Sequence, residues 1–335
     1  MGQLGHPAKG LPPAPDGRDE FTNRIRSFVR AMRIYTGLDV NSDFGGRFPW
    51  KSRFIDHAGV KQAYVDEGPR DSAVTFVCLH GNPTWSFLYR EFIKRLSLSQ
   101  RVIAVDHVGF GRSDKPRDPA YYTIERHVEN FERLLIQAGT SNVIPIIHDW
   151  GGPIGMGWAT RHPVIVAGVV VLNTAAFVHE PVPNLPWLFK LLTGGYKRAV
   201  ENNSFVEWFV ARVGTARRMT NVDLDPYRAP FPTPDDRMGV ARMPNIWEGG
   251  NLGYETYVSA VAIEAALPAL REKPALICWA LKDRAFCRRH LARWLYVFAN
   301  VDGPHFLPNA RHFLQEDAAP EILDHIERWM RCFTV

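Results

Sequence analysis

The chain has 335 residues, of which 46% are hydrophobic and 22% charged, so it contains enough apolar material for a large folded core. Its 40 Lys and Arg residues against 35 Asp and Glu give a net charge of +5, but they form no Lys/Arg-rich run, so the charge does not predict nucleic-acid binding. The four cysteines form no CxxC pair, which argues against a zinc site and against a disulfide framework. No run approaches about 18 consecutive apolar residues, and the polar start MGQLGHPAKGLPPAPDG has no signal-peptide core. We therefore expect a cytoplasmic protein without an integral membrane segment.

The first 47 residues are interpreted as an N-terminal extension. Residues 1–18 are polar and rich in Pro and Gly, which is typical of disorder. Apolar residues then recur at steps of three and four with arginines between them, which predicts one basic amphipathic helix. We expect this helix to pack on the main body or on a sister subunit, giving a homo-oligomer, and binding to a membrane surface is the alternative. The apolar positions are Phe21, Ile25, Phe28, Met32 and Tyr35.

Short β-branched apolar runs alternate with glycines and helix-like segments from Phe48 onward. KSRFIDH and KQAYVDEG predict a strand pair with a turn at Gly59. AVTFVCL, RVIAVD, NVIPIIH, VAGVVVLN and ALICWAL predict further strands, another is expected near HFLP, and EILDHIERWM predicts a closing amphipathic helix. Nearly continuous apolar strands separated by helices indicate an α/β fold with a mostly parallel sheet and helices on both faces.

The strand pattern is interrupted between Phe177 and about Leu267. Tryptophans, prolines and basic residues gather there, as in PVPNLPWLFKLL and SFVEWFVARV, which indicates a helical cap inserted over the sheet. We therefore expect a main domain of residues 48–177 and 268–335 and a cap of residues 178–267. Candidates for the pocket wall are Phe177, Trp187 and Phe189, although the pattern leaves open which aromatics belong to the core.

Titratable residues follow several of the predicted strands. HGNPTW, Asp149, Asp283 and His312 each come at a strand end, and ligands of parallel sheets bind at the carboxyl ends of strands. The order nucleophile, acid, histidine is that of α/β-hydrolases, whose nucleophile lies on a sharp strand–turn–helix elbow. Gly151 and Gly152 suit that elbow, and Asp tolerates positive φ, but Ile147 stands where the motif usually has glycine. The alternative for Asp149 is a helix N-cap.

Five blocks together resemble the haloalkane dehalogenase family: HGNPTWSFLYR, DHVGFGRSDKP, HDWGGPIG, WALKDRAF and PNARHFLQED. The resemblance runs from about Phe48 to the C-terminus and is closest to the third subfamily. That branch also resembles the β-lactone decarboxylases of olefin biosynthesis. The resemblance implies an α/β-hydrolase fold with a helical cap and no cofactor or metal.

The resemblance also implies a mechanism. Asp149, ionised at pH 7, displaces a leaving group from a saturated carbon and forms an alkyl-enzyme ester. His312 then activates water to split the ester, and Asp283 holds the imidazole in the correct tautomer. The backbone N–H groups of Asn82 and Trp150 form the oxyanion hole, and their side chains donate to the halide.

Some members of the family take the acid from the strand before the cap, but that strand here ends with Asn173, so Asp283 is preferred, with a helix N-cap as its alternative role. We expect Asp106 and Ser113 to fix a loop, His80 to orient backbone, and His148 to serve packing rather than catalysis.

Three activities remain open for a small apolar substrate. Hydrolytic dehalogenation is the leading interpretation, and decarboxylation of a long-chain β-lactone is the second, because both use the same residues. Epoxide hydrolysis is the third and would require cap tyrosines to protonate the epoxide oxygen; the candidates are Tyr196, Tyr227, Tyr254 and Tyr257. A non-catalytic binding module is disfavoured, because every position of the catalytic pattern is filled.

Overall fold

The computed structural model describes residues 37–178, 195–245 and 251–331. Tyr35–Val335 form one unit of the chain, separate from Met1–Ile34, and the fold belongs to that larger unit. The predicted N-terminal helix, Trp187 and Phe189 lie outside the described residues.

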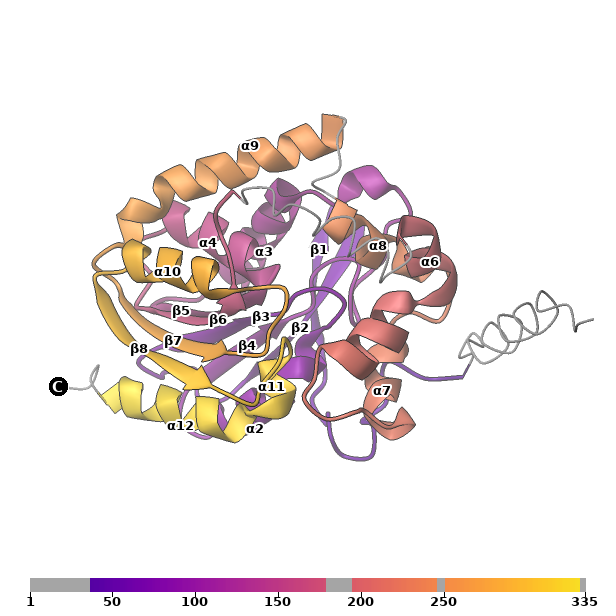
Figure 1. Ribbon diagram of the computed structural model, residues 1–335, viewed down its shortest axis with the longest axis horizontal. Coiled ribbons are helices and arrows are strands. Elements are labelled where there is room, and N and C mark those ends of the chain that lie inside the picture. Colours follow the sequence, from indigo (N-terminus) through magenta and orange to yellow (C-terminus); the bar gives the residue numbers. More distant parts are fainter. Residues whose placement is uncertain (1–36, 179–194, 246–250, 332–335) are drawn as a thin grey trace, which may run out of the picture. The chain divides into compact units, whose positions relative to one another are not determined.

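An eight-stranded sheet in the order β1-β2-β4-β3-β5-β6-β7-β8 forms the centre of the unit (Figure 1). The β1–β2 and β2–β4 pairs are antiparallel, and every other neighbouring pair is parallel. All residues of β3, β4 and β6 are buried, as expected for strands that are covered on both faces. The strands are β1 (Arg53–His57), β2 (Val60–Glu67), β3 (Thr75–Leu79), β4 (Arg101–Val105), β5 (Val143–Asp149), β6 (Val169–Thr174), β7 (Pro274–Ala280) and β8 (Asn300–Leu307).

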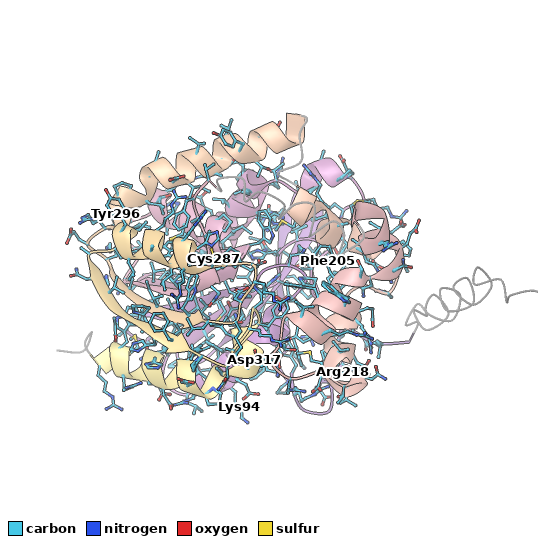
Figure 2. All side chains as sticks on the ribbon, viewed as in Figure 1. Lys94, Phe205, Arg218, Cys287, Tyr296 and Asp317 are labelled. Carbon is cyan, nitrogen blue, oxygen red and sulfur yellow. The ribbon has the colours of Figure 1, made fainter. Side chains whose placement is uncertain are left out.

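Helices cover both faces of this sheet. α2 and α12 pack against each other on one face, and α3 and α4 pack against each other on the other (Figure 1). Side chains fill the space between the sheet and these helices (Figure 2). The predicted α/β fold, its strands and its closing helix are confirmed. The helices are α2 (Arg90–Leu96), α3 (Ile124–Ala138), α4 (Gly151–Arg161), α10 (Arg288–Val297), α11 (Leu314–Asp317) and α12 (Ala319–Met330).

Helix α3 shows how the sequence sets these elements. Thr123 caps its N-terminus by accepting the N–H of Arg126, and Gly139 ends it in the left-handed conformation, with φ 61°. Between these caps, apolar side chains recur at the helical period and are buried, and the helix packs mainly on α4.

The described chain between β6 and β7 consists mainly of helices joined by short loops. Trp85 of the main body donates its indole N–H to the carbonyl of Pro226 at 2.9 Å, and Tyr227 donates its hydroxyl to Glu316 at 2.5 Å. None of the helices in the described ranges is long and apolar enough to cross a membrane. The elements are α6 (Gly195–Asn202), a π-helix (Phe205–Val213), α7 (Asn221–Arg228), α8 (Met238–Asn245) and α9 (Asn251–Ala266).

Candidate active site

Asp149 lies at the sharp turn between β5 and α4. Its φ of 50° is in the left-handed region, which Asp adopts more readily than most residues. Ile147 replaces the usual elbow glycine and fits because Gly155 of α4 faces it, where an added Cβ would lie 2.7 Å from the Ile147 methyl group. The motif usually makes this room with a glycine at the position of Ile147 on the strand. In this protein, Gly155 on the helix makes the room instead. The N-cap of α4 is Trp150, so the N-cap alternative for Asp149 is wrong.

The two carboxylate oxygens of Asp149 have different surroundings. Oδ1 accepts the backbone N–H of Asn82 at 2.7 Å, and the backbone N–H of Trp150 also donates to this carboxylate. Oδ2 lies 3.6 Å from Nε2 of His312. Burial raises the pKa of Asp149, and the charge of His312 and the two N–H groups oppose that rise. Oδ1 thus accepts from one predicted oxyanion-hole donor, the other donor also bonds this carboxylate, and Oδ2 faces the imidazole.

His312 lies between β8 and α11 and is buried. Its Nδ1 lies 3.1 Å from Oδ2 of Asp283, and its ring is stacked on Phe286 with ring centres 5.9 Å apart. Burial disfavours the charged imidazole, but the carboxylates of Asp283 and Asp149 outweigh it, so the pKa of His312 is raised. An imidazole placed between two carboxylates is suited to take a proton from a water beside Asp149.

The Asp283 carboxylate follows β7 and its side chain is completely buried. It accepts the backbone N–H of Ala285 at 2.7 Å on Oδ1 and the amide of Asn173 at 3.1 Å on Oδ2. The Asn173 side chain is itself fixed, because it accepts the N–H of Ala280 and donates to the carbonyl of the same residue. Cys287 occupies the N-cap of α10, so the N-cap alternative for Asp283 is wrong.

Asp106 and Ser113 fix the loop that follows β4, as the sequence predicted, and Asp106 also holds the segment that follows Asn82. Asp106 accepts the backbone N–H groups of Ser86 and Arg112, and Ser113 donates its hydroxyl to the Asp106 carbonyl. His80 donates from Nδ1 to the Gly81 carbonyl, next to Asn82, at 2.8 Å.

His148 has a role that the sequence did not reveal. Its Nε2 lies 2.8 Å from the backbone carbonyl oxygen of His312, so this nitrogen carries the proton and donates it. A histidine on the strand before the elbow gives no local signal of such a bond, because its partner is 164 residues away in the chain.

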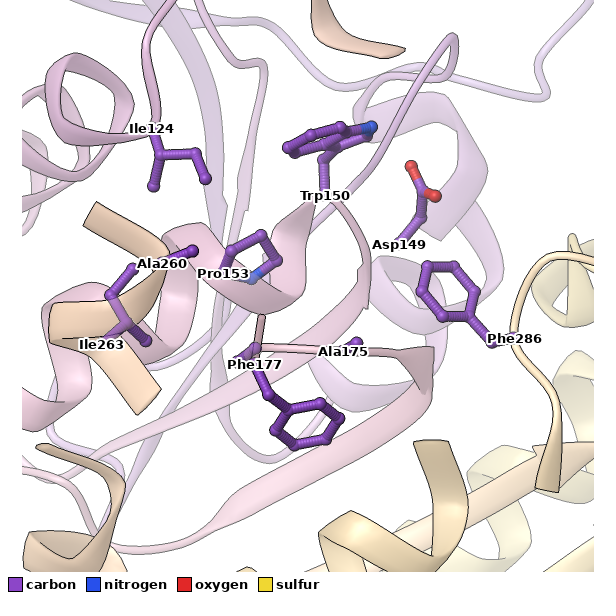
Figure 3. A pocket seen from close by; sticks show the side chains of 10 residues that line it. Ile124, Asp149, Trp150, Pro153, Ala175, Phe177, Ala260, Ile263 and Phe286 are labelled. Carbon is purple, nitrogen blue, oxygen red and sulfur yellow. The ribbon is translucent and has the colours of Figure 1, made fainter. Parts of the chain in front are cut away.

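An apolar cavity of about 100 Å³ opens beside Asp149. Figure 3 shows Asp149 with Phe286 on one side and Trp150 on the other, and the Trp150 indole nitrogen is at the end of the ring toward the carboxylate. Phe177, predicted to be part of the pocket wall, lines this cavity. The lining residues are Ile124, Asp149, Trp150, Pro153, Ala175, Ala176, Phe177, Ala260, Ile263 and Phe286.

Asn82 connects this site to the inserted helices. Its Nδ2 donates to the carbonyl of Val240 in α8 at 3.1 Å, which uses one of its two N–H bonds. Within the described ranges, no group of three or more His, Cys, Asp or Glu side chains could hold a metal ion.

Comparison with known proteins agrees with this geometry. A family model for the α/β-hydrolase fold matches residues 74–319. The chain belongs to the α/β-hydrolase family. Among its relatives, this α/β-hydrolase is 34% identical to the cis-3-alkyl-4-alkyloxetan-2-one decarboxylase of Shewanella oneidensis, over 84% of this chain and 89% of the relative. It is 33% identical to haloalkane dehalogenase 2 of Mycobacterium tuberculosis, over 82% of this chain and 93% of the relative. These similarities also confirm the resemblance to the haloalkane dehalogenase family.

Solved structures of haloalkane dehalogenases are also similar to this chain. The tetrameric haloalkane dehalogenase DpaA from Paraglaciecola agarilytica superimposes with a TM-score of 0.71 at 27% identity, over 81% of this chain and 90% of that one. The structure of a mutant of DbjA superimposes with a TM-score of 0.73 at 26% identity, over 84% of this chain and 98% of that one.

The tyrosines of the inserted helices that the structure describes lie away from Asp149. Tyr227 of this α/β-hydrolase is fully buried and donates to Glu316, and Tyr257 is 49% exposed. Neither lines the cavity beside Asp149. The side chains of Tyr196 and Tyr254 lie outside the described residues. Tyr227 and Tyr257 are therefore not placed to protonate an epoxide at this site.

Proposed function

We propose that this α/β-hydrolase converts a haloalkane and water to an alcohol, a halide ion and a proton. The observation that carries the proposal is a carboxylate at the elbow, with one oxygen 3.6 Å from the His312 imidazole and an apolar cavity beside it. A carboxylate is ionised without a base and attacks a saturated carbon, whereas a serine at the same place would need a base.

In the first step Oδ2 of Asp149 attacks the carbon that bears the halogen. The new C–O bond forms as the carbon–halogen bond breaks, and the halide leaves with the electron pair. The negative charge of Asp149 is lost in the resulting ester. Oδ1 remains bonded to the N–H of Asn82, and together with the N–H of Trp150 this bond holds the carboxylate in position for in-line attack.

In the second step His312 removes a proton from water, and the hydroxide attacks the ester carbonyl carbon of Asp149. The negative charge then develops on Oδ1, which accepts the Asn82 N–H, and the Trp150 N–H donates to the same side chain. One such donor is worth about 3 kcal/mol of transition-state stabilisation. The alcohol leaves with the proton from His312, and Asp149 is left as a carboxylic acid. This acid then loses its proton to solvent, which restores the Asp149 carboxylate and releases the proton of the overall reaction. Asp283 keeps the Nδ1 proton in place throughout and stabilises the imidazolium.

The leaving halide needs neutral donors in a dry site. We infer that the Trp150 indole and the second N–H of the Asn82 amide supply them, since the first is bonded to Val240. Because Val240 belongs to α8, the halide site and the inserted helices are then connected through one side chain.

The further properties that we propose follow from the sequence. Residues 178–267 act as a cap over a main domain of residues 48–177 and 268–335, and the substrate is small and apolar because the cavity is apolar. Residues 1–47 form an extension through which the protein assembles as a homo-oligomer, and the related DpaA is a tetramer. The enzyme acts in the cytoplasm.

A second candidate activity is decarboxylation of a β-lactone to an alkene and CO₂. The observation that favours it is the 34% identity to a cis-3-alkyl-4-alkyloxetan-2-one decarboxylase over 84% of this chain. Such a substrate would use the same Asp149 and the same N–H groups, so the triad geometry does not discriminate between the two reactions.

One experiment decides between them. Purified protein is supplied in parallel with 1-bromoalkanes and with cis-3,4-dialkyl-β-lactones, and bromide release and alkene formation are measured. Bromide release with multiple turnovers supports the dehalogenase, whereas alkene formation without bromide release would replace it with the decarboxylase. Failure of both reactions in a folded protein would refute both candidates.

A further inference from the structure

We propose that His148 is a positioning residue for the ester-hydrolysis step, because it holds the backbone of the catalytic base His312 in place relative to the nucleophile. This inference rests on the proposed function, since it assumes an alkyl-enzyme ester. His148 directly precedes Asp149 on β5, and its Nε2–H donates to the His312 carbonyl at 2.8 Å. The dipeptide His148–Asp149 thus carries the nucleophile and also holds the backbone of the catalytic base His312.

The His148 imidazole makes this bond in a dry environment. The side chain is completely buried, and its ring centre lies 4.8 Å from that of His312. Its Nδ1 has no hydrogen-bond partner among the described residues. The polar part of this side chain is therefore committed to the His312 carbonyl.

The charge state of His148 fits that role. Burial and the neighbouring His312 lower the pKa of His148 well below its ordinary value, so the ring is neutral. A neutral ring has one N–H, and the carbonyl fixes it on Nε2. When His312 becomes an imidazolium during water activation, His148 adds no competing positive charge beside it.

The hydrogen bond from His148 to His312 matters more for hydrolysis of the ester than for its formation. Attack by Asp149 on the substrate needs the carboxylate and its two N–H donors, and these do not include His312. Hydrolysis of the ester needs Nε2 of His312 within reach of a water beside Asp149, and the present Nε2–Oδ2 separation is 3.6 Å. A shift of the His312 backbone would change that separation and leave the first step nearly intact.

The test measures both steps separately by rapid mixing and mass spectrometry of the Asp149 ester, with 1-bromohexane as the probe. His148→Met removes the donor but keeps an unbranched side chain of similar size, and His148→Gln returns a donor near the Nε2 position. His148→Asn remains polar but is too short to reach the carbonyl, and it serves if the methionine variant does not fold.

The matched control is Tyr227→Phe. It removes a buried hydroxyl that donates to Glu316, four residues after His312, and so weakens the same segment without touching the His312 carbonyl. Its melting temperature is expected to fall as in His148→Met, but the ratio of the two rates is expected to remain that of the wild type.

The expected result is ester accumulation in His148→Met and His148→Asn, with hydrolysis slowed about tenfold to a hundredfold, since a shift of about 1 Å costs roughly that much. His148→Gln should restore hydrolysis to within about threefold, because one donor is retained. Equal slowing of both steps in His148→Met, unchanged hydrolysis, or the same accumulation in Tyr227→Phe would each overturn the role of His148. A His312→Ala variant that forms no ester at all would refute the covalent mechanism itself. If His312→Ala forms the ester normally but His148→Met hydrolyses it at the wild-type rate, only the role of His148 is refuted.

Discussion

Asp283→Asn is the substitution whose effect the structure specifies in most detail. In the wild type, Oδ1 of Asp283 accepts the Ala285 N–H, and Oδ2 accepts from Asn173 and faces Nδ1 of His312. The backbone N–H of Ala285 can only donate a hydrogen bond, so an asparagine at position 283 must place its side-chain oxygen toward Ala285. Its NH₂ group then faces His312.

The amide of Asn173 cannot relieve this conflict, because both its oxygen and its nitrogen are bonded to Ala280. His312 must therefore accept at Nδ1 and carry its proton on Nε2, which is the wrong tautomer for a base. In serine hydrolases the same exchange lowers kcat about 10⁴-fold, or roughly 5.5 kcal/mol at 1.36 kcal/mol per tenfold. We expect a loss of about 10³- to 10⁴-fold in ester hydrolysis and less than about tenfold in alkylation, since only hydrolysis uses His312 as a base.

Single-turnover kinetics with a bromoalkane, followed by mass spectrometry of the intact protein, would measure both rates in Asp283→Asn. Circular dichroism of the variant serves as the control for folding. Wild-type hydrolysis in this variant would refute the tautomer argument. An equal loss in both steps would show that Asp283 supports the fold and not the base.

Three further predictions address the other residues of the site. Asp149→Asn should lose multiple turnover completely, with the substitution verified by mass because a slow return to Asp would imitate residual activity; sustained turnover by the verified variant would refute the nucleophile. Ester hydrolysis needs neutral His312, so its rate should fall as pH drops through the pKa of His312. The Asp149 charge that helps to raise this pKa is absent in the ester, so the midpoint of the rate profile should lie below the His312 pKa that NMR measures in the free enzyme. A kinetic midpoint equal to the NMR value would contradict this reasoning. Asn82→Ala should lower kcat/KM for a bromoalkane by about tenfold or more and that for a carboxylate ester much less, because a donor to a charged partner is worth roughly 1.5–3 kcal/mol; equal losses would mean that Asn82 only holds its loop.

Local patterns were sufficient to predict the framework of this protein. Apolar runs and turn residues predicted the strands, and the rule that sites form at strand ends predicted which residues should meet. Asp149, Asp283 and His312 do meet, with separations of 3.6 and 3.1 Å from His312. Their chemical roles, and those of Asn82 and Trp150, remain predictions that the substitutions above would test.

The parts that the sequence did not reveal depend on contacts between distant segments. The bond from His148 to the His312 carbonyl joins residues 164 positions apart, and that from Asn82 to Val240 joins residues 158 positions apart. Neither partner is marked by spacing or composition, since a backbone carbonyl is present at every residue. Asn173 was recognised as unsuitable for the acid, but its hydrogen bond to Asp283 becomes visible only when β6 and β7 lie side by side.

The pairing of β6 with β7 has an evolutionary consequence. Val169 to Leu172 lie opposite Ala275 to Cys278 in parallel, so the long segment between these strands leaves at the carboxyl end of β6 and returns at the amino end of the neighbouring strand. Closing a longer loop between two fixed ends adds little entropy cost, about 0.6 kcal/mol for each doubling of its length. Insertions, deletions and exchange of this segment between relatives can therefore alter the walls of the pocket while the strands hold Asp149 and Asp283 in place. The catalytic residues and the range of accepted substrates can therefore change at different rates as such proteins evolve.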